Sequence, residues 1–250
     1  MDDVVLSERR GAVALLTLNR PQARNAINVE LAKAIFATID AAQDAGCIVL
    51  TGADPAFCAG LDLRNLGVDK LADIPWFNEA VRNSGVPVIA AVNGAAVAGG
   101  LELALAADFI VASENARFAD THLRVGVYPG PVAVDLPRRV GMAKAREMSL
   151  TGNFVDARTA ERIGLANHVV PHAELIPFTL TLAEAIAEQD RKKVATLRRD
   201  WRANATLPMD QALTAHLGFS VQGGHSGSSS ANLTQSRDSV LERSRQQRGA

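Results

Sequence analysis

GAAVAGGLELALAAD, at residues 94–108, is the stretch that decides how the centre of this chain folds. Two adjacent glycines, Gly99 and Gly100, precede an apolar run that predicts a helix. The first N–H groups of a helix have no intrahelical acceptor and carry partial positive charge, and glycine lets a ligand approach that backbone closely. Glu102 follows Gly99 by about one turn, so its carboxylate should project from the same face as the Gly99 amide. The stretch therefore predicts an oxyanion donor beside an acid or base.

Strands and helices alternate around this stretch. Buried strands are predicted at 12–18, 47–50, 87–92 and 109–112. A helix is predicted at 29–44, where apolar residues recur at helical spacing and Asn28 can serve as the N-cap. This alternation favours an α/β architecture. Further helices are predicted at 141–150, 156–163, 172–189, 191–206, 208–222 and 231–247.

Composition narrows the class of protein. The 250 residues are 48% hydrophobic with a net charge of −1, so the chain can bury a large core but has no field to attract nucleic acid or an anionic membrane. No apolar run reaches the roughly 18 residues of a membrane span, and the start, MDDVVLSERR, is not a signal peptide. Cys47 and Cys58 form no disulfide framework, which favours the cytoplasm. The five histidines show no metal-binding spacing, and no metal is expected.

Two other segments carry chemistry. In FCAGLDL, at residues 57–63, Gly60 permits an unusual turn that can aim the following amide into a cleft, although an ordinary tight turn explains the same residues. In FADTHLRVGVYPG, at residues 118–130, Asp120 and His122 precede a turn rich in glycine and proline. Asp120 would share a face with His122 only if this segment is extended.

Several motifs together resemble a known family. They are NRPQARNAI (19–27), LTGADPAFCAGLDL (50–63), VNGAAVAGGLELALAAD (92–108), RFADTHLRVGVYPG (117–130) and MSLTGNFVDARTAERIGLANHVVP (148–171). In order and spacing they resemble the enoyl-CoA hydratase/isomerase family, also called the crotonase family. The resemblance covers residues 4 to about 190.

The resemblance implies both fold and ligand. The expected fold is an α/β spiral of ββα units over residues 1–190, with a C-terminal helical region at 191–250 for trimerisation or as a lid. The expected assembly is a homotrimer or a hexamer of two trimers. The expected partner is an acyl-CoA thioester, whose coenzyme A belongs to the substrate, and no separate cofactor is implied. The amides of Leu61 and Gly99 would polarise the thioester carbonyl. The residues expected to contact the thioester are Gln22, Arg24, Ala26, Ala59, Gly60, Leu61, Asp62, Leu63, Arg64, Gly99, Gly100, His122, Pro129 and Gly130.

The chain departs from the family in its second catalytic group. Hydratases of the family place two glutamates on either side of a water. One matches Glu102, but the other position holds His122. The turn after Gly130 is also one residue shorter than usual. His122 can hold a water or donate a proton, oriented by Asp120, or it can be a hydrogen-bonded residue of the pocket wall.

Three functions follow from these residues. The first is a hydratase of trans-2-enoyl-CoA, with Glu102 as acid or base and His122 assisting. The second is an isomerase in which Glu102 alone moves a proton between carbons. The third is a catalytically silent acyl-CoA binder. Trp76 and Phe77 either line the acyl pocket or pack in the core, and Cys58 is expected to fill space.

Overall fold

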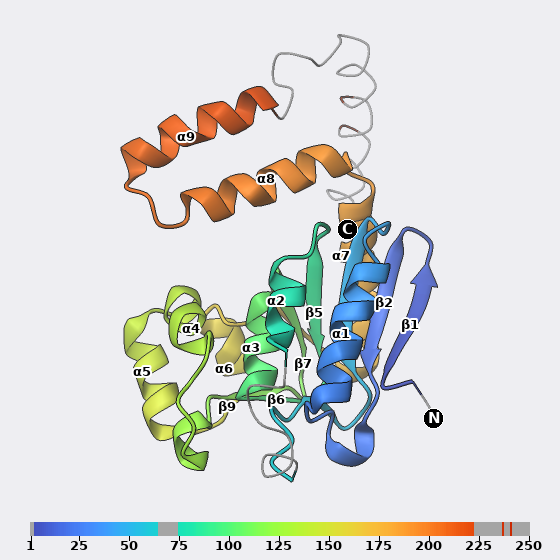
Figure 1. Ribbon diagram of the computed structural model, residues 1–250, viewed down its shortest axis with the longest axis vertical. Coiled ribbons are helices and arrows are strands. Elements are labelled where there is room, and N and C mark those ends of the chain that lie inside the picture. The colour runs from blue at the N-terminus through green and yellow to red at the C-terminus, as the bar shows by residue number, and fades with distance from the viewer. Residues whose placement is uncertain (1–2, 65–74, 223–236, 238–240, 242–250) are drawn as a thin grey trace. The chain divides into compact units, whose positions relative to one another are not determined.

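The computed structural model describes residues 3–64, 75–222, 237 and 241. The chain divides into two compact units, Met1–Gln189 and Asp190–Ala250, and each is described by itself. The first unit contains the described strands and helices α1 to α7 (Figure 1).

The first unit is built on a six-stranded sheet with strand order β1-β2-β3-β5-β7-β10. Its strands are β1 (Val5–Arg10), β2 (Val13–Leu18), β3 (Cys47–Gly52), β5 (Val88–Val92), β7 (Phe109–Ser113) and β10 (His168–Val170). β1 and β2 are antiparallel, and the other neighbours are parallel. β3 and β5 are buried along their whole length, which explains their uninterrupted apolar sequences. The four predicted strands are confirmed, with slightly different ends.

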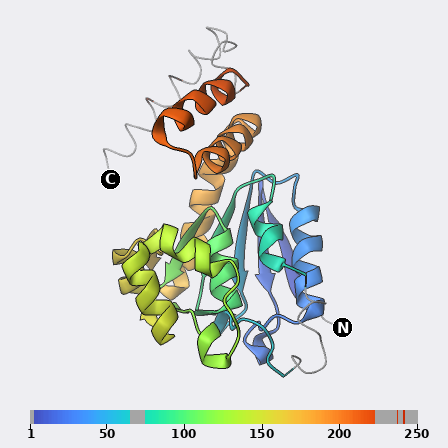
Figure 2. The same ribbon diagram turned by 60° about the vertical axis from the view of Figure 1, so that its left-hand side comes forward.

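A second sheet has strand order β4-β6-β8-β9. Its strands are β4 (Ala56–Cys58), β6 (Ala95–Val97), β8 (Arg117–Ala119) and β9 (Val155–Asp156). β3, β5 and β7 are each followed by one strand of this sheet and then by a helix. These three helices are α2 (Phe77–Arg82), α3 (Gly99–Ala106) and α4 (Val132–Val140). The repeat confirms the expected spiral of ββα units (Figure 2).

Helices cover both faces of the larger sheet. Alternate side chains of a strand point to opposite faces, so Ile48 and Leu50 pack in the cluster that holds the buried side chains of α1 (Val29–Ala41). Val49 packs on the other face, in the cluster that contains residues of α7 (Leu175–Ala187). The main core therefore lies between the sheet and helices α1 to α3.

Most helix predictions agree with the structure. The Asn28 side chain accepts a hydrogen bond of 2.9 Å from the Leu31 amide and caps α1 as expected. The predicted helices at 141–150, 156–163 and 172–189 correspond to α5 (Met142–Thr151), α6 (Ala157–Arg162) and α7. Sequence reasoning missed α4, which contains Pro137, and α2, which has only six residues. Proline inside a helix and a short helix both weaken the periodic signal.

The second unit contains the predicted helices α8 (Arg191–Asn204) and α9 (Met209–Gln222). Asp190 caps α8 by accepting a hydrogen bond of 3.0 Å from the Lys193 amide. The helix predicted at 231–247 lies outside the described residues, apart from 237 and 241. Among the described helices, none is both long and apolar enough to cross a membrane.

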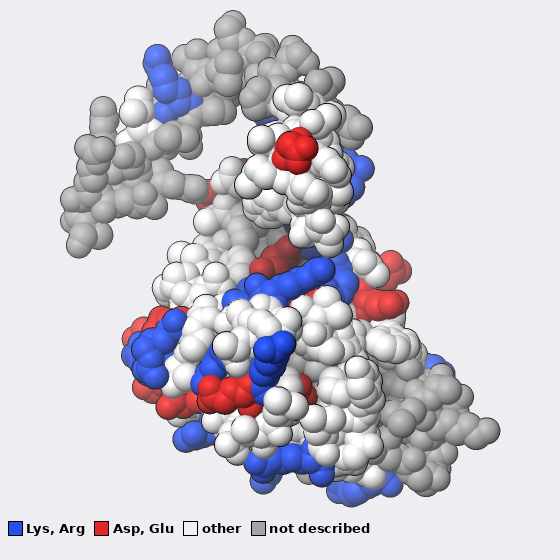
Figure 3. Space-filling view, turned by 90° about the vertical axis from the view of Figure 1, so that its left-hand side faces the viewer, with Lys and Arg blue, Asp and Glu red and all other residues white. Residues whose placement is uncertain are grey.

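The surface carries both signs of charge. On the face shown in Figure 3, lysine and arginine side chains alternate with aspartate and glutamate around uncharged areas. This mixed pattern agrees with the net charge of −1.

Candidate active site

Gly60 and a short parallel bridge aim the Leu61 amide. Gly60 has a φ of +90°, a conformation that favours glycine. The Ile27 amide donates to the Gly60 carbonyl (2.7 Å), and the Asp62 amide donates to the Ile27 carbonyl (2.9 Å). Residues 60 and 62 therefore face Ile27, and the Leu61 N–H points the opposite way. A Cβ built on Gly99 would lie 3.7 Å from the Leu61 nitrogen, so the two amides are neighbours.

The start of α3 supplies the second amide. Ala98 has a φ of +48°, a strained value for a residue with a Cβ, and its amide donates to the Ala119 carbonyl at 2.9 Å. α3 then begins at Gly99, as predicted. A Cβ on Gly100 would lie 2.0 Å from the Cys58 carbonyl oxygen, so this position requires glycine for packing. Within the described part of the chain, neither the Gly99 nor the Leu61 amide donates a hydrogen bond.

An acid–base group lies beside these amides. Glu102, in the first turn of α3, and His122 are each 6% exposed. Glu102 Oε1 lies 3.9 Å from His122 Nε2 and accepts a hydrogen bond of 3.3 Å from the Val132 amide. On its other side, His122 Nδ1 lies 2.7 Å from Asp120 Oδ1. Three ionisable side chains thus form a line, Asp120–His122–Glu102.

Burial and neighbouring charges perturb all three groups. Burial raises the pKa of Glu102 above its ordinary value of 4.5, and the charge of His122 and the Val132 amide offset this only in part. Burial lowers the pKa of His122, but the hydrogen bond to Asp120 and the charge of Glu102 together raise it above 6.5. Burial also acts against ionised Asp120, yet His122 and the Ser149 hydroxyl hold the pKa of Asp120 below 3.8. Ionised Asp120 therefore accepts a hydrogen bond from the Nδ1–H of His122, and Nε2 faces Glu102.

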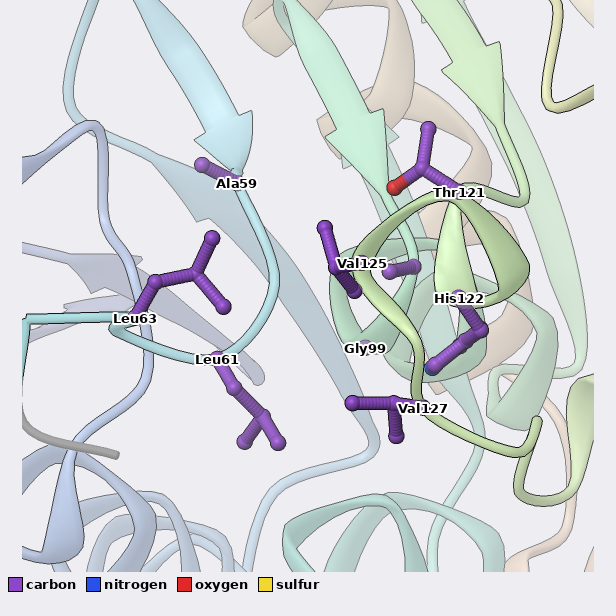
Figure 4. A pocket seen from close by; sticks show the side chains of 9 residues that line it. Ala59, Leu61, Leu63, Gly99, Thr121, His122, Val125 and Val127 are labelled. Atoms are coloured by element: carbon purple, nitrogen blue, oxygen red, sulfur yellow. The ribbon is translucent and has the colours of Figure 1, made fainter. Parts of the chain in front are cut away.

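Two adjoining cavities open onto this group. The smaller, shown in Figure 4, has a volume of about 50 Å³ and is lined by Ala59, Leu61, Leu63, Ala98, Gly99, Thr121, His122, Val125 and Val127. The larger has a volume of about 260 Å³ and is lined by Leu61, Pro75, Trp76, Phe77, Asn78, Glu102, His122, Val127, Tyr128 and Gly130. Leu61, His122 and Val127 belong to both. The amides and the acid–base pair therefore lie along two neighbouring cavities.

The structure brings the expected catalytic residues, Leu61, Gly99, Glu102 and His122, to these cavities. Ala59, Leu63 and Gly130 also line them, as do Trp76 and Phe77. Of the other expected contacts, Gln22 and Arg24 are exposed, Ala26 and Gly100 are buried, and Pro129 is half-buried. Sequence reasoning missed Asn78 and Tyr128, for which the sequence holds no distinctive signal.

Asp62 and Arg64 lie at the edge of the site. The Asp62 carboxylate pairs with Arg20 at 3.2 Å and accepts a hydrogen bond of 3.3 Å from the Arg64 amide, so it caps the local turn. The Arg64 side chain is 75% exposed, and its Nε lies 3.5 Å from Asp62 Oδ1. Burial raises the pKa of the Cys58 thiol to about 12, which suits a space-filling residue. Among the described residues, no three or more His, Cys, Asp or Glu side chains are arranged so that they could hold a metal ion.

The chain is similar in sequence and in fold to known proteins. The profile of the enoyl-CoA hydratase/isomerase family matches residues 8–247. A probable enoyl-CoA hydratase of Rhizobium meliloti (strain 1021) is 44% identical over 194 residues, 74% of this chain and 76% of that protein. The crystal structure of an enoyl-CoA hydratase from Mycobacterium smegmatis is 42% identical, with a TM-score of 0.73 over 89% of this chain and 99% of the other. An enoyl-CoA hydratase from Bacillus anthracis is 26% identical, with a TM-score of 0.86 over 95% of this chain and 96% of the other.

Proposed function

Because the chain belongs to the enoyl-CoA hydratase/isomerase family, we propose that it adds water across the double bond of a trans-2-enoyl-CoA thioester. The observation that carries this proposal is the Glu102–His122 pair, whose facing atoms are 3.9 Å apart. Hydration needs one group that takes a proton from water and another that gives a proton to Cα. A carboxylate and an imidazolium in one cavity meet that need.

The amides of Leu61 and Gly99 stabilise the negative charge that forms during the reaction. The thioester oxygen accepts hydrogen bonds from both N–H groups and becomes the enolate oxygen as water attacks. Fixed donors in a site that excludes water need no reorganisation, and one such donor is worth about 3 kcal/mol in the transition state. Support for this role comes from the proximity of the two amides and from the cavity that both residues line.

Glu102 and His122 together account for every proton that moves in the hydration. The water oxygen forms a bond to Cβ while Glu102 takes one of its protons, and the double-bond electrons move toward the thioester to give the enolate. The enolate then takes the Nε2 proton of His122 at Cα. Glu102 returns its proton to His122, through a water or a small side-chain movement across the 3.9 Å gap. Both groups recover their starting state, and one water has been added.

Two substrates distinguish hydration from the alternatives. With crotonyl-CoA, a hydratase removes the enoyl absorbance. With a 3-enoyl-CoA, an isomerase using Glu102 alone makes that absorbance appear. Binding of both thioesters without turnover identifies a silent binder. We expect loss of the crotonyl-CoA signal, and its persistence would overturn the proposal.

The activity is expected to have a bell-shaped pH profile. The active form holds Glu102 ionised and His122 protonated, and the pKa values of both are raised. The acidic limb should therefore lie above 4.5 and the alkaline limb above 6.5. Asp120→Asn removes the negative charge that helps to raise the pKa of His122, so the alkaline limb of kcat/KM should move to lower pH. Asp156→Asn, at an exposed helix cap, is the matched control, and an alkaline limb equally placed in both variants would contradict the role of Asp120.

We also propose that the C-terminal unit mediates assembly into trimers or hexamers in the cytoplasm. Support comes from large apolar side chains exposed within this unit, such as Trp201 (63%), Leu213 (59%) and Leu217 (66%). Exposed apolar side chains in such numbers are typical of association surfaces. The two cysteines are buried and form no disulfide, which suits a reducing compartment.

A further inference from the structure

Asn78 is a polar residue in an apolar position. It lies on α2 between Phe77 and the buried residues Ala80 and Val81, and is itself 2% exposed. Its side chain makes no hydrogen bond to the described residues, and its Oδ1 atom is buried without a partner. The residue lines the larger cavity together with Glu102 and His122.

A buried amide without partners is costly. Leaving such a group unsatisfied costs about 1–3 kcal/mol, and nearly all buried polar groups in native proteins have a partner. The two ends of a carboxamide exchange places when it rotates about its last bond. Either its acceptor or its donor can therefore face the cavity, so a ligand that enters the cavity can supply the missing hydrogen bond.

The cavity wall indicates the chemistry of that ligand. Apart from Asn78, the described lining is mostly apolar, with Leu61, Trp76, Phe77 and Val127. The only ionisable carboxylate among these lining residues is Glu102, and no lysine or arginine is among them. In the proposed active form ionised Glu102 and protonated His122 carry opposite charges, so this lining has no net charge to attract an ion. A hydroxyl is a small neutral group that can donate a hydrogen bond to Oδ1 or accept one from the amide nitrogen of Asn78, so it suits this lining.

We propose that Asn78 is a specificity residue that binds a hydroxyl group on the acyl chain of the substrate. The larger cavity then selects hydroxylated trans-2-enoyl-CoA thioesters over plain aliphatic ones of equal length. This inference rests on the proposed hydration of enoyl-CoA, because the cavity next to Glu102 and His122 is where the acyl chain would lie.

The test compares 2-hexenoyl-CoA with its 4-, 5- and 6-hydroxy derivatives. For the wild type, kcat/KM with the best hydroxylated thioester should exceed that with 2-hexenoyl-CoA by about 10- to 100-fold, the range expected for one satisfied buried polar group. Asn78→Leu keeps the size but removes the hydrogen bond, so the preference should fall to about 1 or below. Asn83→Leu, at the exposed C-cap of the same helix, should keep the wild-type preference.

Binding gives a readout that does not depend on turnover. Isothermal titration with hexanoyl-CoA and its hydroxylated derivatives should show the same preference in the wild type and its loss in Asn78→Leu. Equal affinities and equal kcat/KM values in the wild type would overturn the proposal and indicate that water alone satisfies Asn78. A hydroxyl preference in binding without hydration of any thioester would instead contradict the proposed function and leave the role of Asn78 intact. If Asn78→Leu fails to fold, the comparison of plain and hydroxylated thioesters in the wild type still tests the proposal.

Discussion

Replacing Glu102 with glutamine is expected to lower kcat for enoyl-CoA hydration by about 10²–10⁴-fold, the usual contribution of a positioned acid or base. The affinity for a saturated acyl-CoA should change little, because glutamine keeps the shape of the side chain and an oxygen that accepts from Val132. Burial raises the pKa of Glu102, so the ionised carboxylate disfavours folding at neutral pH. The variant should therefore be at least as stable as the wild type. Initial rates, titration with butyryl-CoA and thermal unfolding measure the three quantities.

Glu30→Gln is the matched control. Glu30 is an exposed glutamate in the first turn of α1, so the same chemical change is made at a similar helix position away from the cavities. It should keep the wild-type kcat. Full activity of Glu102→Gln would exclude both hydration and isomerisation through this carboxylate. A loss of activity that follows a lower Tm would assign Glu102 a structural role.

Gly60→Ala is expected to lower kcat by about 10²–10³-fold, as removal of one oxyanion donor does, and to lower the Tm as well. At a φ of +90° the added Cβ is strained, and it would lie 2.8 Å from the Val97 carbonyl oxygen and 3.4 Å from the Gly99 nitrogen. The turn must shift to relieve this contact, and the shift misdirects the Leu61 amide. Stopped-flow or steady-state rates with crotonyl-CoA measure the loss, and calorimetry measures the Tm.

Gly141→Ala separates backbone strain from damage to the amides. Gly141 has a φ of +79°, and a Cβ there would meet nothing within 4 Å. The substitution should lower the Tm while kcat stays near the wild-type value. If Gly60→Ala keeps its kcat, or if both variants lose kcat alike, the Leu61 amide is not the oxyanion donor that we propose.

The sequence predicts the centre of the fold well because its signals are local. The apolar runs of β3 and β5 are buried on both faces, and the double glycine at Gly99 and Gly100 marks the start of α3. α4 escapes prediction because Pro137 contradicts a helix unless the surrounding structure supports it. Sequence patterns thus predict those elements whose residues favour that structure locally. The other elements form because of tertiary packing.

The same distinction applies to the residues of the candidate site. Those in local sequence motifs can be predicted, and those that only the fold brings together cannot. Leu61, Gly99, Glu102 and His122 are identifiable because each stands in a motif. The contact between Asp120 and His122 was expected only for an extended segment, yet it forms where His122 begins a 3₁₀ turn. Asn78 has no motif at all. Its significance comes from burial without a partner, a property of the folded chain alone.

The bridge between Ile27 and Leu61 joins the segment expected to bind coenzyme A to the turn that carries the proposed oxyanion donor. The segment before Ile27 carries Gln22 and Arg24, where the coenzyme A portion is expected, and the Ala59 amide also donates to the Arg24 carbonyl at 3.0 Å. Under the proposed function, contacts made far from the reacting carbon would be transmitted through these backbone hydrogen bonds to the Leu61 amide. Binding energy gained at the nucleotide can therefore be used to orient the carbonyl. A substrate shortened at its coenzyme A end should lose turnover as well as affinity.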